Sequence, residues 1–236
     1  MSDQLDSNST DYVVSAAKVA LGAVPLVGPL LTELAGTVIP KQRLDRLVDY
    51  SRKLEMKIGS VDQDILRSKL HDENFTDLLE ETVRQAAQAV TDERREYLAS
   101  LLASGVTESH ISAVESRHIL RMLSEINDIE IIWLRFFSSP ALQGDREFRE
   151  KHAAVLQPIS SSMSASPNER ERRALQENYA EHLISLGLLT RPIRVDPRTG
   201  LPEFDRANGM WKTQGTQVTP FGKLLLRYVG LSGPSS

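Results

Sequence analysis

The fold of the second half of the chain is decided by residues 173–195, RALQENYAEHLISLGLLTRPIRV, and by the two dozen residues after them. A helical stretch ends at Gly187. The extended segment after it reverses direction at a turn over 196–200, and its second strand ends at Thr219. A closing helix begins at Pro220 and carries apolar side chains at helical spacing. Helix, hairpin and helix in this order are typical of a winged-helix domain.

The residues before this stretch fit the same interpretation. They predict a strongly apolar helix over 129–137, a charged helix over about 145–156, a Ser-rich loop over 158–167 and a recognition helix over 168–186. We therefore expect a winged-helix-like domain over 128–230. It follows a helical module over 12–127, and the tails 1–11 and 231–236 are expected to be disordered. The fold class that the sequence predicts is mainly α, a helical bundle followed by this smaller α domain with a β-hairpin.

Composition limits the classes of protein to be considered. The chain has 236 residues, of which 40% are hydrophobic and 25% charged, as in ordinary globular proteins. It has no Cys, which excludes disulfides, thiolate catalysis and Cys-ligated zinc. The start of the chain is acidic and polar, unlike a secretory signal, so we expect a cytoplasmic protein, with peripheral membrane attachment as the alternative.

Local signals divide the helical module. Asp72 or Asn74 can cap one helix, and Thr91 can cap the next, which we expect to stop at Gly105. Upstream, Ser60 can begin a new helix after a break at Gly59. The sequence therefore predicts a series of short packed helices.

A short coiled-coil-like seam follows Lys41 within the helical module. Its apolar residues recur at heptad spacing and are Leu47, Leu54, Ile58, Val61 and Ile65. Such a seam can join two copies of a chain, so we expect self-association through 44–65.

The apolar stretch 13–40 precedes the seam and contains only two charged residues. Pro25 and Pro29 interrupt it, and it is too short for the roughly 20 apolar residues of a spanning helix. It is a buried core hairpin, an oligomer interface or a membrane-active element, and the sequence leaves the three open. Its candidate contact residues are Val19, Leu21, Val24, Leu26, Val27, Leu30 and Leu31.

Arginines cluster in the predicted winged helix and suggest a nucleic-acid footprint. The candidate residues are Arg170, Arg172 and Arg173 at the start of the recognition helix, and Arg191, Arg194 and Arg198 on the wing. Acidic residues interleave with them, and from Asp128 onward 14 Lys and Arg face only 12 Asp and Glu. This balance permits DNA binding but favours a contact with protein. Trp211 is expected to pack back on the domain; an exposed Trp would instead be a contact residue.

Catalytic signatures are weak. Ser15 and Lys18 fit Ser-x-x-Lys without its companion motifs, and no Gly-x-Ser-x-Gly or Walker loop occurs. His110 and His118 lie eight residues apart, whereas helical metal pairs prefer three or four. We therefore expect no enzyme activity, no metal and no cofactor.

Three segments resemble a bacterial group, the abortive-infection alpha family. They are residues 23–31 (AVPLVGPLL), residues 92–103 (DERREYLASLLA), and LGLL at 186–189 followed by VTPFG at 218–222. The resemblance covers about two thirds of the chain. It implies a helical front part, a winged-helix-like end, and a bacterial, non-enzymatic role in phage defence or the stress response.

We thus expect an interaction or regulatory protein. Its winged helix would contact a protein partner, and the chain would associate with itself. Two alternatives are a DNA-binding transcriptional regulator and a membrane-active effector that works through the apolar segment.

Overall fold

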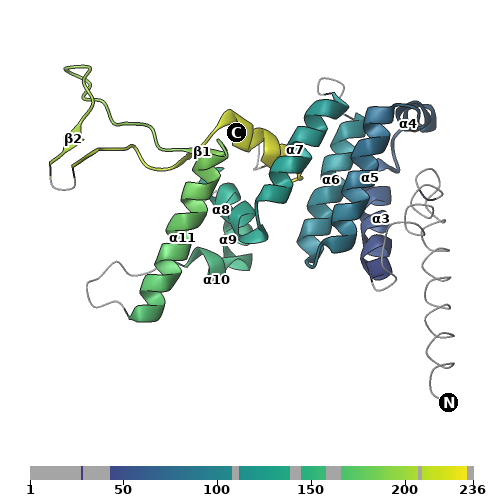
Figure 1. Ribbon diagram of the computed structural model, residues 1–236, viewed down its shortest axis with the longest axis horizontal. Helices are drawn as coiled ribbons and strands as arrows, with labels where there is room; N and C mark the ends of the chain where they lie inside the picture. The colour runs from purple at the N-terminus through teal and green to yellow at the C-terminus, as the bar shows by residue number, and fades with distance from the viewer. Residues whose placement is uncertain are drawn as a thin grey trace, which may run out of the picture. The chain divides into compact units, whose positions relative to one another are not determined.

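The computed structural model describes residue 28 and residues 43–107, 112–138, 145–157, 166–206 and 209–232. The apolar stretch 13–40 therefore lies outside the described residues except for Gly28, and so do the tail 1–11 and most of the Ser-rich loop. Within the described ranges the protein is mainly helical, with a small β element in its second half (Figure 1). No helix among these residues is long and apolar enough to cross a membrane.

The chain divides into two compact units. Unit 1 consists of residues 1–125 and 228–230, and unit 2 of residues 126–227 and 231–236. The boundary predicted from the sequence lies between 127 and 128, two residues later, and that prediction assigned 228–230 to the second domain.

Unit 1 is a bundle of helices. Its elements are α3 (Leu44–Ile58), α4 (Gln63–Leu70), α5 (Glu73–Gln88), α6 (Asp92–Thr107) and α7 (Ala113–Glu125). Helix α3 packs chiefly on α6, and α5 contacts α3, α6 and α7. The core is built of Leu-rich faces, with Leu54, Leu78, Leu98 and Leu123 fully buried. Burial of such faces is the main stabilising term for short helices.

Side-chain caps set several of these helix starts. The Asp72 carboxylate accepts a hydrogen bond from the Asn74 amide at the start of α5, and the Thr91 hydroxyl accepts one from the Arg94 amide in α6, so two predicted caps are confirmed. The predicted cap at Ser60 is wrong. The cap of α4 is Asp62, whose carboxylate accepts a hydrogen bond from the Asp64 amide.

Helix α6 runs past the glycine at which the sequence predicted its end. It continues through Gly105 to Thr107. A Cβ on Gly105 would lie 3.3 Å from the Leu78 side chain, so this glycine lets α5 and α6 approach closely. Packing against a neighbouring helix, rather than a local stop signal, explains its position.

Unit 2 begins with α8 (Asp128–Ser138), α9 (Arg146–Lys151), α10 (Ala153–Leu156) and α11 (Pro167–Ser185). The predicted single helix over 145–156 is divided in two at His152. Ser166 caps α11 with a reciprocal capping box to Glu169, so the helix begins one residue earlier than predicted. The β elements follow, and α12 (Pro220–Tyr228) closes the unit.

The β element is a forked arm. At its base β1 (Leu189–Thr190) pairs antiparallel with β4 (Gln217–Val218). We call residues 191–216, which lie between them, the arm. One branch of the arm folds back through a bridge between Val195 and Pro202, and the other is the antiparallel pair β2 (Phe204–Asp205) and β3 (Met210–Trp211). In Figure 1 the arm extends away from α11 and α8 of its own unit.

Close backbone contact holds the arm to α12. A Cβ on Gly222 would lie 2.3 Å from the Leu188 carbonyl oxygen, so only glycine fits there. The Thr219 hydroxyl donates to the Gly187 carbonyl at 2.7 Å and accepts from the Gly222 amide at 3.0 Å. These contacts fix the base of the arm where α11 ends and α12 begins.

Candidate interaction site

The arm exposes an unusual amount of apolar surface. Half of the large hydrophobic side chains that the described residues expose belong to it: Ile193, Val195, Leu201, Phe204, Met210 and Trp211. Met210 and Leu201 are each 65% exposed and Trp211 is 52% exposed. Scattered single apolar residues are normal on a surface, but six within one arm make it a candidate interaction site.

Trp211 is one member of this group. It faces Phe204 across the β2–β3 pair, with ring centroids 5.3 Å apart and the planes at 79°. The expectation that Trp211 packs back on the domain is wrong. Its indole is held by the neighbouring strand and remains about half exposed. Two rigid aromatic rings presented in this way lose little side-chain entropy on binding, which is why such residues dominate protein interfaces.

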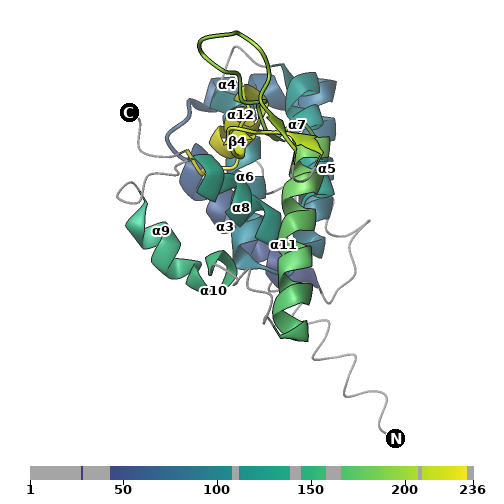
Figure 2. The same cartoon turned by 90° about the vertical axis from the view of Figure 1, so that its left-hand side faces the viewer.

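A network of polar contacts joins two helices of unit 2. Helix α11 lies beside α8, and the two are joined by His182, whose Nδ1 lies 2.6 Å from Oε1 of buried Glu130. The other oxygen of Glu130 accepts from the Asn127 amide at 2.8 Å, and the Asn127 side chain accepts from the Glu130 amide at 3.0 Å. Figure 2 shows α11 beside α8 and the arm beyond the end of α11. No local pattern in the sequence indicated the pairing of His182 with Glu130.

The candidate nucleic-acid residues fall into two groups along the chain. Arg170, Arg172 and Arg173 lie in the first two turns of α11, whereas Arg191 follows its far end. At 1.5 Å per residue the two groups are about 20 Å apart along the helix axis. The structure therefore places three of the arginines near the start of α11 and the other three beyond its end, at Arg191, Arg194 and Arg198 of the arm.

Acidic side chains lie beside four of these arginines. Within the arm, Arg194 Nε lies 3.3 Å from Glu203 and Arg198 Nε lies 3.9 Å from Asp196, while Arg191 pairs with Glu181 of α11. On α11, Arg173 pairs with Glu177 at 2.9 Å. Exposed pairs of this kind contribute little stability, but a phosphate would have to compete with each carboxylate.

The predicted oligomer seam is mostly used inside unit 1. Leu47, Leu54 and Ile58 are buried within the unit, where α3 packs chiefly on α6, so they cannot meet a second chain while the unit is folded. Val61 is half-buried beyond the end of α3, and Ile65 is exposed on α4. The heptad spacing therefore reports an intramolecular packing face. The candidate membrane or oligomer residues from Val19 to Leu31 lie outside the described residues.

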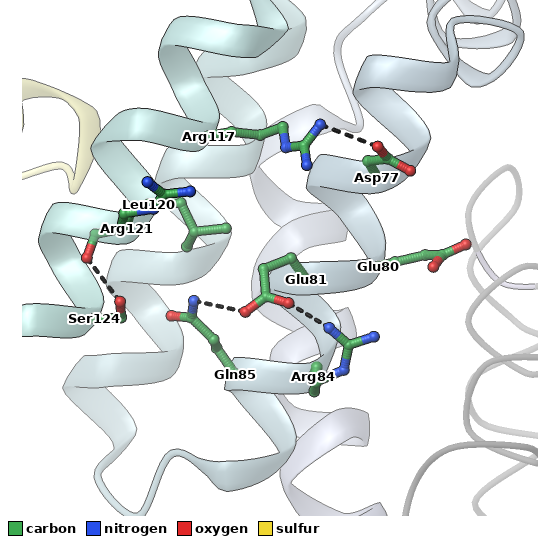
Figure 3. Close-up of a pocket in the computed structure, with 9 residues that line it drawn as sticks. All are labelled: Asp77, Glu80, Glu81, Arg84, Gln85, Arg117, Leu120, Arg121 and Ser124. Atoms are coloured by element: carbon green, nitrogen blue, oxygen red, sulfur yellow. Dashed lines mark hydrogen bonds and ion pairs between the residues drawn. The ribbon is translucent and has the colours of Figure 1, made fainter.

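Unit 1 contains a polar cleft of about 520 Å³ between α5 and α7 (Figure 3). Arg117 and Asp77 form an ion pair across it at 3.0 Å, and Glu81 accepts a hydrogen bond from Gln85 at 3.1 Å and pairs with Arg84. Most of its charges thus satisfy one another.

Of the residues that the sequence suggested weakly for catalysis or metal binding, the structure describes only His118. Ser15, Lys18 and His110 lie outside the described residues, and His118 lies on α7. Among the described residues, no group of three or more His, Asp or Glu side chains is arranged to hold a metal ion.

Comparisons of the chain with models of protein families, with curated proteins and with solved structures give no significant match. The function is therefore inferred from the arrangement of the residues.

Proposed function

We propose that this chain is an interaction protein whose second unit, a winged-helix-like module, binds a protein partner through the arm. The observation that carries the proposal is the exposure of six large apolar side chains within residues 193–211. Burial of such side chains at an interface is favourable, and the Phe204–Trp211 pair provides the aromatic anchor that protein interfaces typically use. Phage defence or the stress response is the setting that the sequence resemblance suggests for this contact.

The order of elements in unit 2 supports the winged-helix interpretation. Helices α8 and α11, the β1–β4 pair and α12 follow one another as the sequence predicted. The arm takes the place of the wing but is forked, and its strands are only two residues long. In this proposal the wing is specialised for contact with protein.

A DNA-binding regulator is less well supported. The arm and α11 carry arginines, but carboxylates accompany several of them, and six large apolar side chains of the arm are exposed. Protein–DNA interfaces are polar and strongly basic, whereas the exposed arm is apolar with mixed charge. A DNA contact would show a steep loss of affinity with salt and with the change Arg191→Glu.

Photo-crosslinking in the cells that make the protein tests the proposal. A photoreactive amino acid replaces Met210 in the full chain, and a matched control replaces Lys223, which is exposed on α12 of the same unit. We expect a protein adduct at position 210, none at 223, and loss of the adduct when Phe204→Ser and Trp211→Ser are added. Equal labelling at both positions, or no protein adduct at 210, would overturn the proposal.

A further inference from the structure

The first strand segment of the arm, residues 192–196, is hydrogen-bonded along only one edge. The Arg194 amide donates to the Lys212 carbonyl at 2.7 Å, and the Arg194 carbonyl accepts from the Glu203 amide at 2.9 Å. The Asp196 amide donates to the Leu201 carbonyl at 3.0 Å, and the Pro192 carbonyl accepts from the Gln214 amide at 2.8 Å. The even-numbered positions of this segment therefore face the rest of the arm.

The odd-numbered positions face the other way, because successive residues of a strand direct their backbone groups to opposite edges. The N–H and C=O groups of Ile193 and Val195 have no hydrogen-bond partner among the described residues. Their side chains are 43% and 44% exposed. An edge of this kind is a template for another strand.

We propose that a second copy of this chain adds to this edge in the antiparallel direction, with a two-fold axis at Arg194. The inference rests on the proposed function, since it identifies the partner of the arm. In this register Ile193 of each copy faces Val195 of the other, and the pair exchanges both of its backbone hydrogen bonds. All four unpaired N–H groups and all four unpaired C=O groups of the two edges are then satisfied.

The apolar side chains fit the same register. Ile193 and Val195 lie on one face of the strand, so two copies bring four β-branched side chains together. Cross-strand pairs of β-branched residues stabilise antiparallel sheets. The interface is isologous, because the same two residues of each copy provide both halves of it.

A proline limits the pairing at each end of this register. The next hydrogen-bonded pair beyond Ile193 and Val195 would join Arg191 of one copy to Pro197 of the other, and Pro197 has no backbone N–H to donate. A longer strand from an unrelated protein would likewise receive no donor from Pro197. The short edge therefore favours a closed pair of copies over open-ended addition.

The charges on the opposite face are compatible with a second copy. Arg194 meets its own counterpart at the axis, but Glu203 already lies 3.3 Å from its Nε. The diagonal neighbour of Arg194 is Asp196 of the second copy, so the dimer places two opposite-charge pairs beside the axis.

The chain has no Cys, so single cysteines report this register directly. Arg194→Cys and Arg198→Cys are made in the full-length protein, which is oxidised at micromolar concentration. The register places the two side chains at position 194 in a non-hydrogen-bonded pair with Cβ atoms about 5 Å apart, within reach of a disulfide. The Asp196 residues of the two copies are roughly 13 Å apart, and residue 198 lies beyond them.

We expect Arg194→Cys to form a disulfide dimer at least about a hundredfold faster than Arg198→Cys, because pairing raises the local thiol concentration to millimolar. The Arg198 side chain is the more exposed of the two, at 90% against 61%, so exposure alone would favour the opposite order. Adding Val195→Pro removes one outward N–H without touching the inward hydrogen bonds, and it should lower the rate to that of Arg198→Cys. Val195→Thr keeps that N–H and the branched shape and should leave the rate unchanged.

Two results would overturn the inference. One is equal crosslinking at 194 and 198. The other is a rate at 194 that Val195→Pro does not change. Neither result decides whether the arm binds a protein at all, which the photo-crosslinking experiment at Met210 tests. In that experiment an adduct of twice the chain's mass identifies a second copy, and an adduct of any other mass identifies a different protein. If the arm is not a contact site, photo-crosslinking at Met210 gives no protein adduct.

Discussion

At the scale of single residues, Glu130 takes part both in the N-terminal cap of α8 and in the contact between α8 and α11. One carboxylate oxygen closes the capping box with Asn127, and the other accepts the hydrogen bond from His182 of α11. The side chain is buried, so loss of either partner leaves a polar group without compensation.

We expect Glu130→Ala to lower the free energy of unfolding of unit 2 by about 1–3 kcal/mol, from the lost cap and the unpaired His182. Both Trp residues of the chain, Trp133 and Trp211, lie in unit 2, so Trp fluorescence during urea unfolding reports this unit. Glu125→Ala, at an exposed position, is the control. A change no larger than that of the control would show that the buried carboxylate is not needed.

A second residue-scale prediction concerns pH. The hydrogen bond from the Ser166 amide, followed by the Ser166 side chain, lowers the pKa of Glu169 below its ordinary value of 4.5. A lowered pKa in the folded state means that the cap stabilises α11 fully above the ordinary pKa and is lost as the pH falls through the lowered one. The Ser166 amide signal in NMR should therefore titrate with a midpoint below 4.5, and this step should vanish in Glu169→Gln. A midpoint at or above 4.5 would contradict the capping box.

At the scale of elements, the junction of β1 and α12 depends on a glycine. A Cβ at Gly222 would lie 2.3 Å from the Leu188 carbonyl oxygen and 2.8 Å from the Val218 side chain. We expect Gly222→Ala to separate α12 from the base of the arm and to cost about 1–3 kcal/mol, as overpacking does. Urea unfolding followed by Trp fluorescence measures this, with exposed Lys223→Ala as control. If both variants unfold alike, the two elements are not in close contact.

At the scale of the whole molecule, stability and recognition lie in different residues. The buried Leu side chains hold each unit together, whereas the apolar arm is exposed and contributes little to folding. Phe204→Ser with Trp211→Ser should therefore leave the unfolding transition nearly unchanged.

The same double variant should markedly shorten retention on a hydrophobic-interaction column, because it removes the largest exposed apolar side chains of the arm. Met56→Ser with Val90→Ser is a matched control, since these two residues of unit 1 are 77% and 79% exposed but lie outside the arm. We expect the control to change retention much less. Equal effects would mean that the arm is not a coherent apolar surface.

The sequence by itself determined the helical character, the order of the elements and several caps. Periodic apolar residues and capping side chains such as Asp72 and Thr91 act over a few residues, so their effect can be read locally. The tertiary structure alone decided which faces of these elements are buried, which charges are paired and which side chains stay exposed. It buried the heptad face of Leu47 and Leu54 within one unit, paired Arg191 and Arg194 with acids, and left Trp211 exposed. Each of these outcomes depends on contacts between residues distant in the sequence, which no local pattern specifies.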